Sequence, residues 1–419
     1  MKDKFKKILK SKVFKNGIWL TILQFVNTVI PVVTLPYITR ILGTSEYGVF
    51  SIALNWVLYF QIFVEFGFGL SGARKVALLK DNDQDKLNKL YNNIISSRII
   101  LFMISFVVLN IIAFISGFNL KMYVSMLILF IMIIGSTFQL TWLFQGKQDM
   151  KFITIINVIS RIISVVLIFL FVKSAKNLYL YCFLYSITLF ISSIISNIIA
   201  FKKYNLSFKF SRIKEIKEEI NDGKYLFASS AMAKIFNSFG ITVLGIISST
   251  SITGIYSAIY KIPYILTMFF FPVSQAIYPF NSSLFKDGLD KALKNVKKIC
   301  FWIFIIFIIP SLIIIMFRNI IINILFGFEY SKYSIIVIPL VLQFLFSVIN
   351  NFVGIQILVA SGNQKKYSKS LLIGCIAIVI CNIVFGKIYG IYGVAWASAI
   401  SEFILCISLY INYKSLLRG

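Results

Sequence analysis

The sequence predicts an all-α polytopic membrane protein with twelve transmembrane helices. Of its 419 residues, 59% are hydrophobic and only 14% are charged, whereas a soluble protein averages about 45–50% apolar and about 25% charged residues. The apolar residues also form long unbroken runs, close to the roughly 20 residues that one spanning helix needs. An outer-membrane barrel would show alternation instead. A cytosolic enzyme, a secreted module and a disordered chain are excluded by the same composition.

The predicted spans follow the apolar runs in chain order. The sixth and seventh are separated by a longer polar stretch, residues 201–224. Seven lysines lie in the first sixteen residues, and the apolar run after them is too long for the hydrophobic region of a cleavable signal peptide. The twelve spans are 17–39, 47–72, 94–116, 122–145, 152–172, 178–201, 225–247, 255–280, 299–317, 334–359, 370–388 and 391–412.

The distribution of the 42 Lys and Arg residues predicts the orientation. The two termini and the loops after even-numbered spans hold 31 of them, and four lie inside spans. Because basic residues concentrate on the cytoplasmic side, both termini are predicted to be cytoplasmic. The net charge of +27 is then explained by topology and by contact with anionic lipid, without a nucleic-acid partner. Only seven face the predicted outer side: Arg40, Lys121, Lys173, Lys176, Arg318, Lys332 and Lys387.

The residue types that carry enzyme chemistry are sparse in this sequence. Histidine is absent, and the five cysteines lie in apolar runs without the spacing of metal ligands. No phosphate-binding glycine loop or nucleophile triad is visible. The sequence therefore predicts no catalytic residue, no metal site and no cofactor. Coupling to H⁺ or Na⁺ remains open.

Two weak internal repeats predict two six-helix lobes in the same orientation. Tyr47–Ser51 opens the second span and Thr253–Ser257 opens the eighth, with similar residues in similar order. The loops after the fourth and tenth spans, Phe144–Gln148 and Ala360–Gln364, form the second repeat. Transporters with such parallel repeats place the substrate path between the lobes and rock them for alternating access. The predicted domains are an N-terminal lobe, a cytoplasmic linker and a C-terminal lobe: 1–200, 201–224 and 225–419.

All seven prolines fall inside predicted spans, and five of them lie in the first and eighth. Ordinary membrane-helix proline is one interpretation, because neighbouring helices satisfy the freed carbonyls. The clustering favours bending elements in these two spans. The predicted hinge residues are Pro31, Pro36, Pro263 and Pro272.

Ionisable residues at membrane depth are costly and usually functional. Lys234 lies ten residues beyond Lys224, or about 15 Å along a helix, and Arg161 reaches a similar depth. Lys261 lies about two turns from the outer side. Because cations outnumber carboxylates at this depth, we expect Lys234, Arg161 and Lys261 to bind an anionic substrate.

The remaining charges have other expected roles. Glu65, Glu402 and Arg74 are candidates for ion coupling or charge pairing. Arg98 lies about one turn from the cytoplasmic side, and we expect it to extend toward the headgroups.

Polar side chains form stripes on five predicted helices. One interpretation is that these side chains form hydrogen bonds between helices. The alternative, favoured where a stripe contains a cation at mid-depth, is a hydrated cavity. The predicted cavity-lining residues are Gln24, Asn27, Asn157, Asn237, Asn350 and Asn351.

Several short motifs, in order along both lobes, resemble Wzx-type O-antigen and polysaccharide flippases. Leu35–Gly43 followed by Glu46-Tyr47-Gly48 is similar to that family's first-helix signature. Further similarities are the acidic-aromatic-Gly-aromatic stretch at Glu65–Phe68 together with Ser71 and Arg74, the fourth-helix exit, the eighth helix and the twelfth-helix entry. The last three are Trp142–Gly146, Gly254–Ile262 and Tyr392–Ala397.

This resemblance implies the fold of the multidrug/oligosaccharidyl-lipid/polysaccharide (MOP) exporters, which is MATE-like. It also implies movement of undecaprenyl-diphosphate-linked oligosaccharide repeat units across the bacterial cytoplasmic membrane. Membrane lipids, a polysaccharide polymerase and a chain-length regulator are the expected partners. Glu65, Arg74 and Lys261 lie within the matched stretches. Some relatives carry a carboxylate in the seventh helix, and its absence here leaves an ion-coupling role of that helix in doubt.

Three alternatives remain at this point. A MATE-like antiporter for small cations would require an acidic cavity, which is not predicted. A membrane polysaccharide polymerase usually has a large outer loop, whereas the longest outer loop here runs only from Phe317 to Tyr333. A lipid II flippase would differ from the favoured function only in its substrate.

Overall fold

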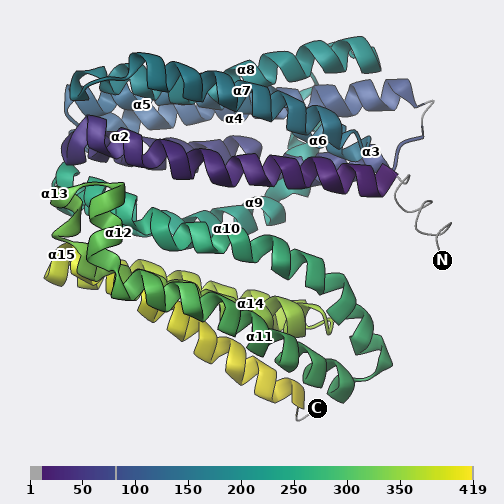
Figure 1. Cartoon of the computed structure of the whole chain (residues 1–419). Helices are drawn as coiled ribbons and strands as arrows, with labels where there is room; N and C mark the ends of the chain where they lie inside the picture. Colours follow the sequence, from purple (N-terminus) through teal and green to yellow (C-terminus); the bar gives the residue numbers. More distant parts are fainter. Residues whose placement is uncertain (1–11, 81–82, 418–419) are drawn as a thin grey trace. The chain divides into compact units, whose positions relative to one another are not determined.

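A computed structural model describes residues 12–80 and 83–417, which are built from helices (Figure 1). The predicted basic N-terminal segment lies largely outside the described residues, as do residues 418–419. The helices, labelled as in Figure 1, are α2 (Lys12–Glu65), α3 (Phe68–Ala77), α4 (Gln84–Ile115), α5 (Leu120–Phe138), α6 (Thr141–Gly146), α7 (Met150–Phe171), η1 (Ala175–Asn177), α8 (Leu178–Tyr204), α9 (Ile213–Ile247), α10 (Thr250–Asp287), α11 (Leu289–Met316), α12 (Arg318–Leu325), α13 (Phe328–Ser331), η2 (Ser334–Ile336), α14 (Val337–Asn351), η3 (Phe352–Val359) and α15 (Gln364–Leu417).

Ten helical segments of the described chain are long and apolar enough to cross a membrane. Two of them each contain two predicted spans. In α2 the helix breaks at Gly43, where φ is 71°, and in α15 it breaks at Gly390, where φ is 57°. Glycine adopts positive φ without the steric cost that a Cβ would add. The twelve predicted spans are thus accounted for, and the predicted all-helical polytopic fold is confirmed.

Several boundaries differ from the prediction. The predicted second span is interrupted at Phe66 and Gly67, both with positive φ. The predicted fourth span divides into α5 and α6 at Gln139, whose backbone is extended. The seventh begins at Ile213, twelve residues before the predicted start. The polar residues of that early part are consistent with a helix because its buried Glu219 has a charged partner.

The chain forms two compact units whose boundaries fall inside helices. The N-terminal unit contains the residues up to Thr34 and Ala53–Ala233. The C-terminal unit contains Leu35–Ile52 and the residues from Lys234 onward. The predicted lobes, 1–200 and 225–419, and the predicted linker, 201–224, remain predictions. The two units are described separately below.

In the N-terminal unit, α4, α5, α7 and α8 run side by side (Figure 1). Small polar residues allow the helices to approach closely, as is usual in membranes. Ser164 on α7 donates from Oγ to the backbone oxygen of Leu184 on α8 at 2.6 Å. Asn197 on α8 donates to the oxygen of Phe138 at the end of α5 at 2.7 Å.

The polar stretch between α8 and α9 includes an extended strap, residues 205–212, which binds along α4. The backbone N–H groups of Ser207, Lys209 and Ser211 donate to acceptors four residues apart on α4. Four residues of helix rise about 6.0 Å, and two residues of extended chain span about 6.6 Å, so the two periods match. The acceptors on α4 are Asn88, Asn92 and Ser96.

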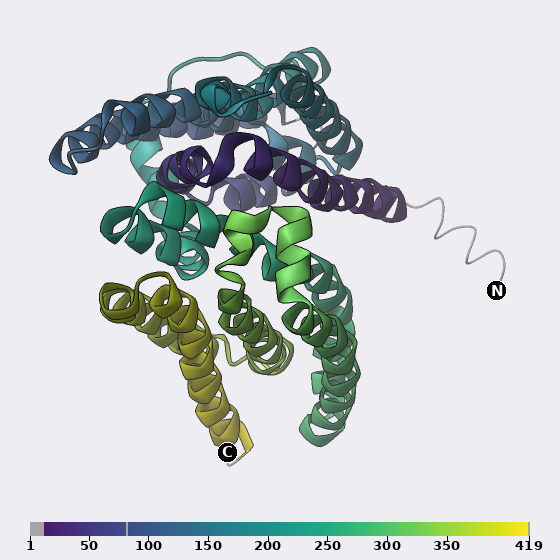
Figure 2. The same cartoon turned by 60° about the vertical axis from the view of Figure 1, so that its left-hand side comes forward.

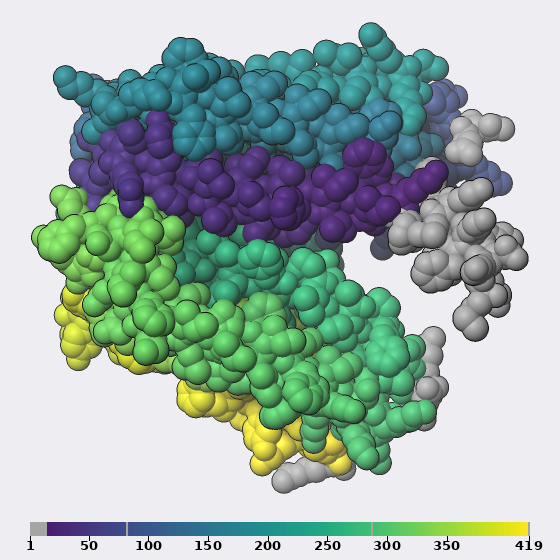
Figure 3. All heavy atoms as spheres, in the orientation of Figure 1, coloured from purple at the N-terminus to yellow at the C-terminus, as the bar shows by residue number. Residues whose placement is uncertain are grey.

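In the C-terminal unit, α10, α11, α14 and α15 surround an aromatic core, seen as the green and yellow helices of Figure 2. Phe270, Phe307, Phe344 and Phe352 form the centre of this cluster. Outside the core, α11 exposes large apolar side chains such as Phe301. Figure 3 shows the surface of this unit in green and yellow. In a membrane such a surface faces lipid.

Candidate functional site

Two lysines of the C-terminal unit lie inside membrane-spanning helices. Lys234 is on α9, Lys261 is on α10, and both side chains are half-buried. The ammonium of Lys261 is close enough to repel that of Lys234, and its Nζ lies 5.3 Å from the centroid of the Tyr264 ring. Like charges held together in low-dielectric surroundings are costly. An anion bound by both would relieve this repulsion, so the pair has the chemistry of an anion site.

Glu402 lies in the same unit and is held by an amide. Its side chain is buried, with 6% of its surface exposed. Asn350 on α14 donates from Nδ2 to Glu402 Oε2 at 2.6 Å and to the Glu402 backbone oxygen at 2.9 Å. Within the described part of the chain, no ion pair involves Glu402. A buried carboxylate with a neutral partner is costly when charged, which suits a group that binds a proton or cation during a transport cycle.

In the N-terminal unit, Glu65 and Arg161 lie in membrane-spanning helices. Glu65 Oε1 accepts a hydrogen bond from Gln61 Nε2 at 2.9 Å. Arg161 on α7 is half-buried, and no hydrogen bond or ion pair of its side chain is found among the described residues. Arg161 belongs to the N-terminal unit, whereas Lys234 and Lys261 belong to the C-terminal unit. The joint anion site of all three remains a prediction.

The expected extension of Arg98 toward the headgroups is wrong. Its side chain is 3% exposed, and Nη1 donates to the backbone oxygens of Ser136 at 3.3 Å and Gln139 at 2.8 Å. These carbonyls lie at the C-terminal end of α5, where helix carbonyls lack intrahelical partners. A cation there is also favoured by the helix dipole. Arg98 therefore caps α5.

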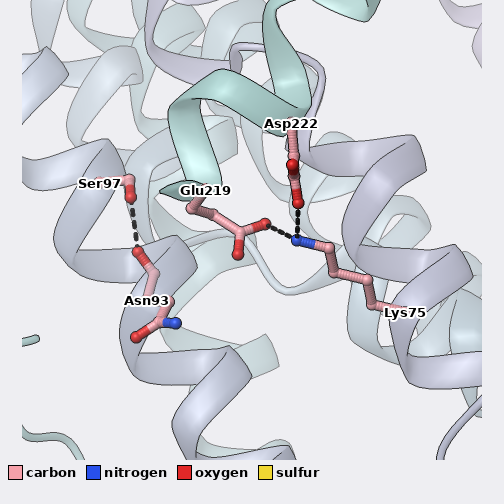
Figure 4. A network of polar contacts seen from close by, with 5 residues as sticks. All are labelled: Lys75, Asn93, Ser97, Glu219 and Asp222. Carbon is pink, nitrogen blue, oxygen red and sulfur yellow. Dashed lines mark hydrogen bonds and ion pairs between the residues drawn. The ribbon is translucent and has the colours of Figure 1, made fainter. Parts of the chain in front are cut away.

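The end of α3 is tied to α9 by a group that we call the lysine latch, made of Lys75, Glu219 and Asp222. Lys75 Nζ lies 2.8 Å from Glu219 Oε1 and 2.9 Å from Asp222 Oδ2, as Figure 4 shows. Glu219 is buried, whereas Asp222 is largely exposed. The neighbouring Arg74, the predicted charge-pairing residue, has an exposed side chain. The sequence did not distinguish these adjacent cations.

The latch continues into an apolar contact on the same face of α9. The rings of Phe66 and Phe227 stack with centroids 4.4 Å apart and planes 5° apart. Because Glu219, Gly223 and Phe227 are four residues apart in turn, they share one helix face. The start of α9 is thus fixed to the turn that follows α2.

The predicted cavity-lining residues fall into different environments. Asn351 Oδ1 accepts from Ser274 Oγ at 2.6 Å, which links the end of α14 to α10. Asn157 Nδ2 donates to Ile153 O of its own helix at 2.7 Å, and Asn27 Oδ1 is buried without a partner among the described residues. Gln24 is half-buried and Asn237 is exposed. Asn350 and Asn351, adjacent at the end of α14, contact α15 and α10 respectively.

The predicted hinge prolines are inside helices that continue through them. Pro31 and Pro36 precede the Gly43 break of α2, and Pro263 and Pro272 lie within α10. Side chains bond carbonyls nearby, as with Thr267 Oγ1 and the oxygen of Pro263 at 3.2 Å. The hinge role remains a prediction.

The corner of α2 packs on the start of α10 through two copies of one pattern that the sequence analysis missed. Residues 44–48 and 250–254 both read Thr-Ser-x-x-Gly. Ser251 Oγ donates to Thr44 Oγ1 at 2.7 Å, and Ser45 Oγ lies 3.3 Å from Thr250 Oγ1. Each contact becomes the other when the copies are exchanged, as in an isologous interface. We call this contact the Thr-Ser crossing.

The glycines of the pattern bring the two backbones together at the crossing. A Cβ on Gly48 would lie 1.8 Å from the Thr250 oxygen, and one on Gly254 would lie 2.2 Å from the Thr44 oxygen. Only glycine fits such an approach. The repeat offset was visible in the sequence, but the contact between the two copies was not.

The α2 corner also contacts the segment around α12 and α13. The guanidinium of Arg40 donates to the oxygens of Ile324 and Asn323 at the end of α12. Thr44 Oγ1 donates to Glu329 Oε2 at 3.3 Å, and Tyr330 OH donates to the Thr39 oxygen at 3.4 Å. The corner is therefore held on two sides within the C-terminal unit.

A family model described as polysaccharide biosynthesis protein matches residues 13–285. The chain belongs to this family. It is 28% identical to a putative O-antigen transporter of Escherichia coli K12 over 360 residues, covering 85% of this chain and 86% of the relative. It is 24% identical to a probable low-salt glycan biosynthesis flippase, Agl15, of Haloferax volcanii over 414 residues, covering 96% and 82%.

Solved structures agree on the fold. The lipid II flippase MurJ in an inward closed conformation superposes with a TM-score of 0.71 at 17% identity, covering 96% of this chain and 87% of that one. A MATE multidrug transporter of the MOP superfamily in an inward-facing conformation gives 0.70 at 13% identity, covering 93% and 96%. The predicted MATE-like fold is confirmed. The chain is a multi-pass membrane protein whose relatives are transporters and flippases, not enzymes.

Proposed function

We propose that this protein moves undecaprenyl-diphosphate-linked oligosaccharide repeat units from the cytoplasmic to the outer leaflet of a bacterial cytoplasmic membrane by alternating access. Family membership carries the proposal, together with the O-antigen transporter and glycan flippase among its relatives. In this proposal both termini are cytoplasmic and the two six-helix lobes rock about the substrate. A polymerase and a chain-length regulator act on the product on the outer side.

Lys234 and Lys261 bind the diphosphate in the proposed cycle, with Arg161 approaching from the other lobe. Lysine and arginine are suited to phosphate oxygens as charge-assisted donors. The glycan occupies the polar space between the lobes, and the polyprenyl tail remains in lipid. The inside-negative potential favours outward movement of the anionic group by about 2.3 kcal/mol per charge per 100 mV.

Glu402 is the proposed coupling residue of the C-terminal lobe. Its neutral partner Asn350 stabilises the carboxylate without cancelling its charge, so a proton or Na⁺ bound there changes the electrostatics of the lobe. Glu65, whose charge acts on Arg98, has a pairing role instead. The prolines of α2 and α10 supply the bends.

The Thr-Ser crossing is the proposed closure on the outer side. The predicted topology places both the α2 corner and the start of α10 on that side. The crossing joins residues from the two proposed lobes, since Thr44 precedes residue 200 and Thr250 follows residue 225. In the outward-open state these contacts must separate.

The test is a complementation experiment in a strain that lacks the chromosomal gene. We expect single repeat units to accumulate on their lipid carrier on the cytoplasmic side of the deletion strain, and the wild-type protein to restore surface glycan. Lys234→Gln with Lys261→Gln is expected to abolish restoration at an unchanged protein level. Lys224→Gln, ten residues earlier on α9 and exposed, is the matched control. Normal flipping in the deletion strain would disprove the proposal.

A small-molecule antiporter is the second candidate, because the MATE and MurJ superpositions are equally good. The lysine pair disfavours it, since a cationic drug would be repelled. Drug susceptibility of the same strains separates the two. Increased susceptibility with normal surface glycan would favour the antiporter.

A further inference from the structure

A surface pocket of about 590 Å³ in the C-terminal unit is lined by residues of α12, α13 and the start of η2. It is formed by the segment 318–334, the light-green spheres of Figure 3, which contains α12 and α13. Six of its lining residues carry polar side chains, and none of these six is acidic. They are Arg318, Asn319, Asn323, Ser331, Lys332 and Ser334.

The positive charge of this pocket is unusual for its side of the membrane. Seven Lys and Arg residues face the predicted outer side, where basic residues are depleted. Two of them, Arg318 and Lys332, line the pocket. A third, Arg40, donates to the backbone oxygen of Asn323, another lining residue. The few outer cations therefore concentrate at one place, which topology does not require.

Neither cation of the pocket has a carboxylate partner among the described residues, and Lys332 Nζ lies 5.2 Å from the centroid of the Phe328 ring. Arg318 Nη1 donates to the Ile315 oxygen at 3.1 Å, but its Nε is buried and has no hydrogen-bond partner in the described chain. Asn319 Oδ1 accepts from Ser334 Oγ, which leaves the Asn319 amide N–H₂ as a donor. The nearest carboxylate in the chain segment, Glu329, accepts from Thr44 and does not line the pocket.

Contacts to the α2 corner hold the pocket in place. Arg40 binds the C-terminal carbonyls of α12, where a cation is favoured. Tyr330, which is 2% exposed, donates to the Thr39 oxygen at 3.4 Å. Both contacts lie within five residues of Thr44. The pocket thus lies directly beside the Thr-Ser crossing.

We propose that this pocket binds the phosphate of a lipid on the outer side, and that its preferred occupant is the diphosphate of the substrate as it leaves the transport path. The inference rests on the proposed function for this occupant. The shared chemistry is a lipid phosphate ester, for which a phospholipid headgroup is the other source. Two cations suit the higher charge of a diphosphate, and the position beside the crossing suits a substrate that passes it.

The experiment measures binding of farnesyl diphosphate to the purified full-length protein in nanodiscs of phosphatidylcholine. The protein carries Lys234→Gln and Lys261→Gln, so that binding at the pocket is measured without binding at the proposed inner site. This double variant is the background. Adding Arg318→Gln with Lys332→Gln is expected to weaken binding at least about tenfold, because charge-assisted hydrogen bonds are lost. Lys387→Gln, exposed on the same predicted side, is expected to leave binding unchanged.

The outcomes separate the site from its occupant. Arg318→Lys with Lys332→Arg keeps the charges and is expected to keep most of the affinity, which excludes loss of fold as the cause. Equal affinity of the Arg318→Gln/Lys332→Gln variant and the background would overturn the site. If phosphatidylglycerol in the nanodisc displaces the probe, the phosphate site stands and the diphosphate as preferred occupant is overturned. The binding assay requires no transport, so its result can be interpreted even if the complementation test fails.

Discussion

The Thr-Ser crossing of the C-terminal unit and the lysine latch of the N-terminal unit both fix the end of a membrane helix, but with different chemistry. The crossing is uncharged and symmetric, and its backbones touch at two glycines. The latch joins one lysine to two carboxylates, one buried and one exposed. A contact made by backbone packing tolerates no added atom, whereas an ion pair tolerates changes in shape and responds to salt. The two contacts should therefore fail under different perturbations.

The largest effect is expected from Gly254→Ala at the crossing. The new Cβ would lie 2.2 Å from the Thr44 oxygen, so the two helices must separate, at a cost of about 3 kcal/mol. The melting temperature in detergent and the amount of surface glycan should both fall. Gly69→Ala is the control, because nothing lies within 4 Å of a Cβ there. Equal melting temperatures for the two variants would show that the crossing is not tightly packed.

A smaller effect is expected from Lys75→Gln in the latch. It leaves the buried Glu219 without its cation, and we expect a loss of about 1–2 kcal/mol in the free energy of unfolding. The loss should shrink in high salt, while that of Gly254→Ala should not. The exchange of Lys75→Glu with Glu219→Lys should restore part of the stability. A loss that is independent of salt and not restored by the exchange would contradict an electrostatic latch.

The hydroxyl pairs of the crossing test its symmetry with a still smaller effect. Removing the hydroxyls of Thr44 and Ser251 (Thr44→Val, Ser251→Ala) in a double-mutant cycle should reveal a coupling of about 0.5–1 kcal/mol. The related pair, Ser45→Ala with Thr250→Val, should show a smaller coupling because its oxygens are 3.3 Å apart rather than 2.7 Å. Zero coupling energy in both cycles would mean that the hydroxyl pairs contribute nothing and that glycine packing alone stabilises the crossing.

The smallest effect is expected from Arg74→Gln, next to the latch. The Arg74 side chain is exposed, and substitutions at such sites usually change stability by less than about 0.5 kcal/mol. The free energy of unfolding in detergent should match that of the wild type within that limit. A loss as large as that of Lys75→Gln would mean that the two adjacent cations act together.

The spans were predictable because lipid imposes a simple rule of length and apolarity. The same rule placed Gly43 and Gly390 between predicted spans, but it did not predict that each helix breaks at a glycine with positive φ. The repeat at Gly48 and Gly254 was visible as a pattern. Its meaning was not, because no periodicity states that two copies of a pattern touch each other.

The candidate site was predicted only as a set of residue types. Depth along a helix identified Lys234, Lys261 and Glu402 as costly charges. In the structure the charges of the two lysines repel each other, and Glu402 has an amide partner. The depth of a residue in a span does not predict which backbone carbonyls a cation binds. Arg98 was therefore assigned to the headgroups instead of to the end of α5. Lys75 and Arg318 were counted only as topology signals, since their partners are far away in the sequence or belong to a folded loop.

The central claim is that the Thr-Ser crossing opens during transport, and a reversible cross-link tests it most directly. Ser45→Cys with Thr250→Cys places two sulfurs where the hydroxyls lie 3.3 Å apart, in a protein whose five native cysteines have been replaced. Surface glycan is measured in deletion cells under oxidising conditions and again after addition of a reductant. We expect export to stop when the crossing is cross-linked and to resume on reduction, with each single-cysteine variant unaffected. Export at the full rate by the cross-linked protein would contradict the account.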